Sequence, residues 1–247
     1  VKKEKEADSE LPKIVIGMDY FEPYSYQASD GEYKGIDVEL AKEAFRRLGY
    51  RPKFENIVWE DKDELLADGT VDCLWSSYSM NGREDKYQWA GPYLYSRQMV
   101  VVRAESEIQT LQELKGKRIA VQATTKAEDL FLHNIKSDLP QMQQVNCFST
   151  TNEIYAALRK SYVDAIAGHE AMLGSLVKEG KDAYRMLDES IYKSELGVAF
   201  KKGTHEEVAA DLTETLKKLQ REGITEKIVT KYGLDADEIL PEGEQNE

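Results

Sequence analysis

The sequence contains few cysteines and no long apolar run. Its 247 residues include two cysteines, Cys73 and Cys147. Cys73 lies in an apolar, strand-like segment, and we predict that both thiols are small buried side chains rather than a disulfide or a pair of metal ligands. Cysteine usage leaves the compartment open, since a domain of this size needs no disulfide in any compartment. No stretch of about 18 apolar residues, the length that a membrane-spanning helix requires, occurs.

Histidine is also scarce, and familiar catalytic motifs are absent. The three histidines, His133, His169 and His205, are scattered, and His133 and His205 have the sequence context of solvated helix residues. The chain contains no HExxH, no CxxC, no phosphate-binding loop and no nucleophile paired with a base. We therefore expect no metal and no cofactor.

The acidic excess disfavours nucleic acid as a partner. There are 46 acidic and 33 basic side chains, a formal net charge of −13, and such a surface repels phosphate backbones. With 41% apolar and 32% charged residues, the composition is that of a globular protein long enough for one large domain or two lobes. The charged ends, 1–10 and 241–247, lack apolar periodicity, and we predict that they are disordered tethers.

Strand-like and helix-like apolar patterns alternate along the chain. Strands are predicted at 13–18, 52–58, 71–78, 98–102, 117–122, 144–148, 163–167 and 196–200. Helices are predicted at 35–48, 60–68, 110–114, 127–134, 151–160, 170–179, 206–221 and 225–232. Strands separated by helices are typical of parallel strands with crossover connections, so the fold class is α/β. The pattern occurs twice, which favours two lobes.

One segment joins a strand to polar side chains that suit one kind of ligand. Residues 72–93, DCLWSSYSMNGREDKYQWAGPY, begin with an apolar strand that runs into Ser76, Ser77 and Ser79, and Arg83 follows. Backbone donors, hydroxyls and one guanidinium at a strand end suit a small carboxylate, since arginine offers a planar pair of donors to its two oxygens. The alternative is a strand, a turn and a solvated arginine.

Other candidate groups also follow predicted strands. They are Asp19 and Phe21 after 13–18, Thr124 and Thr125 after 117–122, and His169 and Glu170 after 163–167. Ligand sites in open α/β sheets lie beyond the carboxyl ends of the strands. The shared position of these groups therefore favours a role in binding.

The order of these motifs resembles the family 3 extracellular solute-binding proteins, which serve amino-acid ABC importers. The matching segments are GMDYFEPYSY (17–26), GIDVELAKEAFRRLG (35–49), GTVDCLWSSYSMNGRE (69–84), WAGPYLYSRQMVVV (89–102), LQELKGKRIAVQATT (111–125), ALRKSYVDAIAG (157–168) and GVAFKKG (197–203). The resemblance implies a two-lobe type II periplasmic-binding-protein fold. Each lobe would be a mostly parallel sheet flanked by helices, with the ligand cleft between the lobes. Lobe 1 would comprise 11–97 with 193–240, and lobe 2 would comprise 98–192.

The resemblance also implies how a ligand is held. Arg83 would bind an α-carboxylate, with the serine strand end, above all Ser77 and Ser79, beside it. Thr125 would add a donor at the start of a helix in the second lobe.

Two aromatic residues would enclose the ligand's side chain by the same resemblance. Phe21 and Trp59 stand where the family places aromatic walls, which can also stack on cations or planar groups. For Trp59 the alternative is a surface aromatic at a strand end.

One departure from the family concerns the α-ammonium. Many members place an aspartate after the second-lobe strand to bind this group, whereas His169 stands here, with Glu170 next. Histidine is a poor acceptor for an ammonium group and repels it when protonated. Three explanations are open: Glu170 supplies the anion instead, Asp19 does so, or the ligand lacks a standard α-amino group. A purely structural histidine is a further alternative.

A second departure is local. The turn between Ser79 and Arg83 is one residue shorter than the commonest family form, and Asn81-Gly82 predicts a tight turn. Arg83 would then approach its ligand from a slightly different direction.

The resemblance implies an extracellular or periplasmic, membrane-tethered protein that captures a small carboxylate-bearing ligand, an amino acid or a derivative, by closure of two lobes. Its partner would be the membrane permease of an ABC importer, and we expect a monomer that is not an enzyme. One alternative is the extracellular sensing domain of a membrane signalling protein, a histidine kinase or cyclase. Another is a dehydratase of cyclic carboxylates, in which Glu170 or His169 would serve as the acid.

Overall fold

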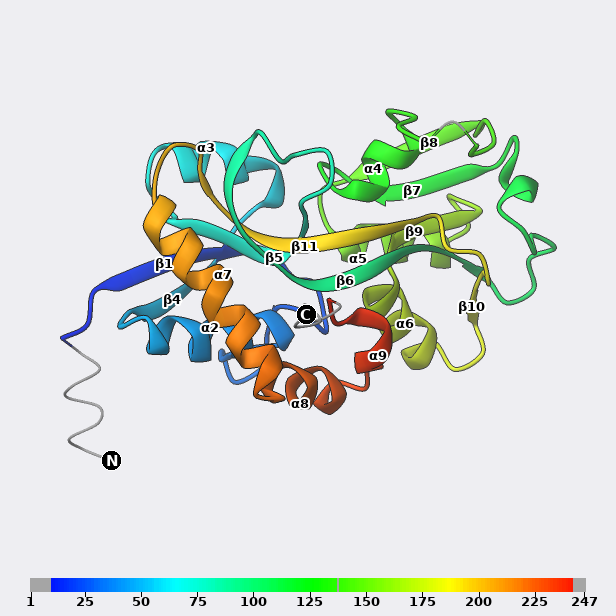
Figure 1. The fold of residues 1–247 in the computed structure, drawn as a ribbon. Coiled ribbons are helices and arrows are strands. Elements are labelled where there is room, and N and C mark those ends of the chain that lie inside the picture. Colours follow the sequence, from blue (N-terminus) through cyan, green and yellow to red (C-terminus); the bar gives the residue numbers. More distant parts are fainter. Residues whose placement is uncertain (1–9, 137, 242–247) are drawn as a thin grey trace, which may run out of the picture. The chain divides into compact units, whose positions relative to one another are not determined.

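A computed structural model describes residues 10–136 and 138–241 (Figure 1). The chain divides into two compact units: unit 1, Val1–Tyr95 with Glu195–Glu247, and unit 2, Ser96–Ser194. The tethers predicted at 1–10 and 241–247 lie, except for Glu10 and Pro241, outside the described residues. Within the described part of the chain, no helix combines the length and the apolar character needed to cross a membrane.

Unit 1 is built on a sheet with the strand order β4-β1-β5-β11. The strands are β1 (Lys13–Met18), β4 (Arg51–Asn56), β5 (Cys73–Ser79) and the later part of β11 (Tyr192–Lys201), while β2 (Tyr26–Gln27) and β3 (Tyr33–Lys34) pair separately. β1 is parallel to β4 and β5, and β11 is antiparallel to β5. The carboxyl ends of β4, β1 and β5 therefore lie at one edge of the sheet.

The helices of unit 1 come from both ends of the chain. They are α2 (Ile36–Arg47), the 3-10 turn η1 (Trp59–Asp61), α3 (Lys62–Ala67), α7 (Glu206–Arg221), α8 (Ile224–Lys231) and α9 (Ala236–Ile239). α2 packs against the C-terminal helices α7 and α8 (Figure 1). The position directly before α2 requires glycine. The φ of Gly35 is 121°, and a Cβ there would lie 2.2 Å from a carbonyl oxygen. Gly49, with φ of 78°, follows the helix end.

Unit 2 is built on a second set of strands, in the order β6-β9-β7-β8, with β10 paired to β6. These are the later part of β6 (Tyr87–Arg103), β7 (Arg118–Gln122), β8 (Gln144–Phe148), β9 (Ala165–His169) and β10 (Tyr184–Met186). Its helices are η2 (Gln112–Leu114), α4 (Lys126–Phe131), α5 (Thr151–Arg159) and α6 (Glu170–Glu179). β7 is parallel to β8 and β9, whereas β6 is antiparallel to β9. Val100, Ile119, Val121 and Leu130 belong to the buried core of this unit.

Most predicted elements are confirmed, and the errors have physical causes. The strand at 144–148 and the helices at 170–179 and 206–221 coincide with β8, α6 and α7. The strand predicted at 98–102 is only the end of β6, whose earlier half contains Gly91-Pro92 and has no apolar run. The sequence patterns did not predict the short strands β2, β3 and β10. The central parallel strands confirm the α/β class.

The prediction for the cysteines is half wrong. Cys73 is buried in β5, but Cys147 is exposed. β8 is the last strand in the order of unit 2 and its residues are exposed or half-buried. A thiol on such an edge strand is less covered than the same residue in a central strand.

Candidate functional site

Ser77 in β5 adopts a left-handed backbone conformation. Its φ is 44°, which costs a residue with a side chain roughly 1–2 kcal/mol. Its N–H donates to Oδ2 of Asp37 at 2.7 Å. Its hydroxyl is buried and has no hydrogen-bond partner among the described residues. Because buried polar groups are almost always satisfied, Ser77 is a candidate donor to a bound ligand.

Asp37 holds this strained segment from helix α2. Its side chain is buried, and Oδ1 accepts a hydrogen bond of 2.8 Å from the Tyr93 hydroxyl. Burial raises the pKa of Asp37 to about 7, although the hydrogen bonds from Ser77 and Tyr93 oppose the rise. Asp37 was not predicted from the sequence, because nothing in a helix pattern marks one acidic residue as buried.

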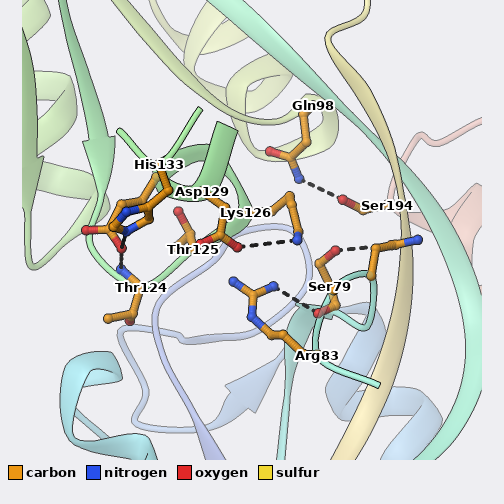
Figure 2. A network of polar contacts seen from close by, with 12 residues as sticks. Ser79, Arg83, Gln98, Thr124, Thr125, Lys126, Asp129, His133 and Ser194 are labelled. Carbon is orange, nitrogen blue, oxygen red and sulfur yellow. Dashed lines mark hydrogen bonds and ion pairs between the residues drawn. The ribbon is translucent and has the colours of Figure 1, made fainter. Parts of the chain in front are cut away.

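Arg83 follows β5 after a tight turn. Its N–H donates to the Met80 carbonyl oxygen at 2.9 Å, and Gly82 has a φ of 78°, as a turn with glycine at its third position requires. The guanidinium donates from Nη1 to the Ser79 carbonyl oxygen at 3.1 Å (Figure 2). Its Cζ lies 5.1 Å from the centre of the Tyr78 ring. The predicted Asn81-Gly82 turn is thus present.

Asp19 and Ser76 form internal hydrogen bonds at the same edge of the sheet. The Asp19 N–H donates to Ser76 Oγ at 3.2 Å, and the hydroxyls of Ser76 and Ser25 lie 2.8 Å apart. Asp19 Oδ1 accepts from the Tyr20 N–H at 2.7 Å. The Ser76 hydroxyl therefore joins the end of β1 to β5.

Phe21 and Trp59 are in contact. Their rings are perpendicular with centres 6.2 Å apart, and Trp59 meets Tyr78 in the same way at 5.1 Å. Trp59 is 2% exposed and belongs to a buried apolar cluster of unit 1. The alternative interpretation of Trp59 as a surface aromatic is therefore wrong.

Lys62, the first residue of α3, was not predicted to lie here. It is 2% exposed, and its Nζ lies 5.4 Å from the Trp59 ring centre and 5.8 Å from that of Tyr78. A lysine in the polar stretch WEDKDE is expected to be solvated, so no sequence signal marks its burial.

Thr124 and Thr125 follow β7 in unit 2. Thr124 has a φ of 60°, donates its N–H to Glu128 Oε2 at 2.8 Å, and has a buried hydroxyl with no partner in the described part of the chain. Thr125 precedes α4, and its hydroxyl donates to the Gln122 carbonyl oxygen at 2.7 Å. The hydroxyl available to a ligand by this criterion is that of Thr124, whereas the prediction named Thr125.

His169 ends β9 and is part of a buried polar network. Its Nδ1 lies 2.8 Å from Ser96 Oγ and 3.1 Å from Gln98 Nε2, and Gln98 also donates to Ser194 Oγ at 3.2 Å (Figure 2). Because the amide nitrogen donates, Nδ1 accepts and the neutral ring carries its proton on Nε2. The ring is thus arranged as a donor rather than as an acceptor for ammonium.

Glu170 and Lys126 form ion pairs within unit 2. Arg97 donates to the two oxygens of Glu170 at 2.8 and 2.6 Å. Lys126 Nζ lies 3.3 Å from Asp129 Oδ2 (Figure 2) and 5.8 Å from the Tyr192 ring centre. One of the three explanations for the missing aspartate is that Glu170 binds the ligand's ammonium. In this structure Arg97 already neutralises that carboxylate.

The topology groups the candidates by unit. In unit 1, Asp19, Phe21, Trp59, Ser79 and Arg83 all follow or end β1, β4 or β5, which share one carboxyl edge. In unit 2, Thr125 and His169 follow or end the parallel neighbours β7 and β9. Within each unit, the residues predicted from separate motifs thus lie at a common sheet edge.

Comparison with known proteins identifies the family. The sequence model of the bacterial extracellular solute-binding proteins, family 3, matches residues 14–235. The chain belongs to this family. The predicted family is therefore confirmed, and with it an extracellular class of protein.

Individual relatives agree with this assignment. The L-cystine-binding protein TcyJ of Escherichia coli is 25% identical over 223 residues, which cover 89% of this chain and 82% of that protein. The glutamate-binding protein GluB of Corynebacterium efficiens is 24% identical over 249 residues, 93% of this chain and 82% of that protein.

A solved structure agrees in fold. The substrate-binding protein of an ABC uptake transporter from Streptococcus pneumoniae, crystallised with bound histidine, is 25% identical, with a TM-score of 0.82 over 95% of this chain and 97% of that one. The predicted type II periplasmic-binding-protein fold is confirmed.

Proposed function

We propose that this solute-binding protein captures an amino acid outside the cell through its α-carboxylate and delivers it to an ABC importer. The observation that supports this most is the end of β5. There Ser77 has a strained backbone and a buried hydroxyl without a partner in the described residues, and the Arg83 guanidinium follows within the same short segment. The names of the cystine-binding and glutamate-binding relatives support an amino acid as the ligand.

Each group has a definite task in this proposal. The Arg83 guanidinium pairs with the carboxylate in two-pronged fashion. Ser77 and Ser79 lie beside it: Ser77 donates its hydroxyl, whereas the Ser79 hydroxyl already donates to Asn81 Oδ1 at 3.3 Å. Phe21 and Trp59 enclose the ligand's side chain. Ser76 and Asp19 support the site indirectly, because their hydrogen bonds hold the ends of β1 and β5 together.

The second unit completes the proposed site. The backbone N–H of Thr125 donates to the carboxylate, since the Thr125 hydroxyl already donates to the Gln122 carbonyl oxygen. His169 with Glu170 contacts the opposite end of the ligand. Binding by residues of both units would favour the arrangement that engages the ligand most strongly, since only differential affinity shifts such an equilibrium. We propose closure of the two units on the ligand as the result.

An enzymatic role is not proposed. A dehydratase would need Glu170 or His169 as a proton donor, and Glu170 is held as a two-pronged ion pair with Arg97. The relatives described above are named as binding proteins. A permease partner, attachment to a membrane and a monomeric state stay predictions.

A ligand screen tests this function. Thermal unfolding would be followed with each standard amino acid, with cystine, with amino-acid derivatives and with small organic acids that lack an amino group. Ligand at 100 times its Kd adds about 2.7 kcal/mol to the free energy of unfolding, so a true ligand raises the midpoint clearly. We expect at least one amino acid to do so, with calorimetry confirming one site. A shift with organic acids alone would contradict an amino-acid ligand.

A further inference from the structure

Arg83, on which the proposed carboxylate site depends, lies in a loop. This loop joins β5, which ends at Ser79, to β6, which begins at Tyr87. Loop positions are more mobile than positions within strands, and ordering a side chain as long as arginine costs conformational entropy. A guanidinium that pairs with both oxygens of a carboxylate needs one position and one orientation. The contacts that hold Arg83 therefore matter for the proposed function.

The indole of Trp89 holds the backbone of Arg83. Trp89 Nε1 donates to the Arg83 carbonyl oxygen at 2.9 Å, and the Lys86 N–H donates to the same oxygen at 3.0 Å. The bond from Lys86 lies within the loop. The bond from Trp89 joins the loop to β6, a strand of the sheet. The indole therefore anchors the loop to a regular element of the fold.

The same indole contacts the ring over which the Arg83 guanidinium lies. The Cζ of Arg83 is 5.1 Å from the centre of the Tyr78 ring, and the ring centres of Tyr78 and Trp89 are 5.4 Å apart. Trp89 also contacts Tyr87, with 5.3 Å between the ring centres. Trp89 thus acts on Arg83 twice, directly at the backbone and through Tyr78 at the charged end.

A chain of hydroxyl groups fixes the orientation of the Tyr78 ring. The hydroxyls of Tyr78 and Tyr87 lie 2.9 Å apart, and the Tyr87 hydroxyl is bonded to Oδ1 of Asp63. Burial opposes the shift, but hydrogen bonds from Lys86 and Tyr87 lower the pKa of Asp63, so its ionised carboxyl accepts. Tyr87 therefore donates to Asp63 and accepts from Tyr78. The ring that contacts Arg83 is tied in this way to α3.

Packing alone does not require a tryptophan at position 89. The Trp89 side chain is half-buried and packs at the margin of a buried apolar cluster, a place that phenylalanine could also fill. Phenylalanine has no hydrogen-bond donor, whereas the indole N–H is a donor that seeks a partner when it is covered. The bond to the Arg83 carbonyl oxygen is therefore what distinguishes tryptophan here.

We infer that Trp89 is a positioning residue of the carboxylate site, which orders Arg83 before a ligand binds. The indole fixes the backbone of Arg83, and its contact with Tyr78 supports the ring beneath the guanidinium. A group that is already ordered loses less freedom on binding, and affinity rises accordingly. This inference rests on the proposed function, because it assigns Trp89 a role through the arginine that takes the ligand's α-carboxylate.

Side-chain NMR measures the ordering of Arg83 without a ligand. In protein with ¹⁵N-labelled arginine, the Arg83 Nε–H signal is identified by its loss in Arg83→Lys. We expect its order parameter to be about 0.85 in the wild-type protein, as for a rigid group, and below about 0.6 in Trp89→Phe. Arg47, which pairs with Glu222 at 2.7 Å, should not change and serves as the internal control. An equal order parameter for Arg83 in both proteins would overturn the inference.

Calorimetry measures the consequence for binding. The probes are L-cystine, L-glutamate and L-histidine, which the names of the relatives and of the solved structure suggest. We expect Trp89→Phe to weaken the binding of each probe that the wild-type protein binds by about 2- to 10-fold, the range for one hydrogen bond. Affinities equal to those of the wild-type protein would overturn the inference.

Tyr232→Phe is the matched control for a general loss of stability. The Tyr232 hydroxyl donates to Glu39 Oε1 at 2.7 Å and accepts from the Gly35 N–H at 3.1 Å, so this variant also removes hydrogen bonds of unit 1. We expect it to lower the thermal midpoint without changing the affinities or the order of Arg83. If Tyr232→Phe weakens binding as much as Trp89→Phe does, the indole acts through stability alone and the inference is overturned.

The outcomes distinguish failure of the function from failure of this inference. If no amino acid or derivative binds the folded wild-type protein, the proposed function fails, and the NMR comparison still decides whether Trp89 orders Arg83. If the probes bind and Trp89→Phe changes neither order nor affinity, the function stands and this inference falls. Should Trp89→Phe fail to fold, replacement of Trp89 by benzothienylalanine removes the N–H from a ring of nearly the same shape, with the same expected results.

Discussion

Both units contain the same local backbone arrangement, but different neighbouring groups support it. Each has a hydroxyl residue with positive φ, Ser77 at 44° and Thr124 at 60°. In each, the backbone N–H donates to a carboxylate on a helix, Asp37 Oδ2 at 2.7 Å and Glu128 Oε2 at 2.8 Å. Both hydroxyls are buried without a partner among the described residues.

The supporting interactions differ in range. The Ser77 segment is held by a fully buried carboxylate 40 positions away in the sequence, and the Thr124 segment by one only four positions away. In unit 1 Lys62 and Arg83 lie over aromatic rings, and in unit 2 Lys126 lies over the Tyr192 ring and also pairs with Asp129. Local opening costs more free energy where buried contacts hold a segment, and Asp37 is buried. We infer that unit 1 dominates affinity and that unit 2 adjusts it.

The largest effect should come from Arg83→Ala. The change removes a two-pronged, charge-assisted contact, and we expect affinity for the ligand to fall by about 100-fold or more, with the circular dichroism spectrum unchanged. Arg97→Ala in unit 2 removes an arginine that is bound to Glu170 and should cost less than about tenfold. Calorimetry on both variants measures the difference, and equal losses would contradict the dominance of unit 1.

The pH dependence of stability should reveal Asp37. Its pKa is about 7 in the folded chain against 3.8 for an unperturbed aspartate, so the folded state binds the proton more tightly. The resulting stabilisation is complete below pH 3.8 and is lost as the pH rises through 7. Asp37→Asn keeps an acceptor for the Ser77 N–H and lets its amide donate to Tyr93.

The midpoint of Asp37→Asn relative to wild type is the quantity to measure. We expect this difference to rise by roughly 5 °C between about pH 5 and pH 8, since the wild-type protein loses about 1.4 kcal/mol for each pH unit until its carboxyl is charged. If the difference in midpoint between Asp37→Asn and wild type does not change with pH, the Asp37 carboxyl is not the source of the pH dependence of stability.

The smallest effect concerns the strained hydroxyl residues. Glycine adopts positive φ freely, so Ser77→Gly and Thr124→Gly should each raise the free energy of unfolding by about 1 kcal/mol or less. Ser77→Gly also removes a proposed ligand donor and should weaken binding roughly tenfold, more than Thr124→Gly. Denaturant titration and calorimetry measure the two quantities, and a larger binding loss from Thr124→Gly would reverse the order of the units.

The sequence patterns predicted features that depend on neighbours along the chain. Periodicity located α6 and α7, and Asn81-Gly82 predicted the turn that precedes Arg83. Strand ends predicted which residues share a sheet edge, because parallel strands place their carboxyl ends together.

Features that depend on distant partners were missed. Lys62 and an exposed lysine have the same sequence signal, and only packing against Trp59 and Tyr78 distinguishes them. The hydrogen bond from Ser77 to Asp37 and the pair of Arg97 with Glu170 join positions 40 and 73 residues apart. Burial of this kind is set by tertiary packing, which single-sequence patterns do not encode.

A crystal structure with the amino acid identified by the screen tests the central claim most directly. We predict that one ligand carboxylate lies at hydrogen-bond distance, about 2.7–3.2 Å, from both the Arg83 guanidinium and Ser77. A carboxylate bound elsewhere, with Arg83 in contact with solvent only, would contradict the proposed site.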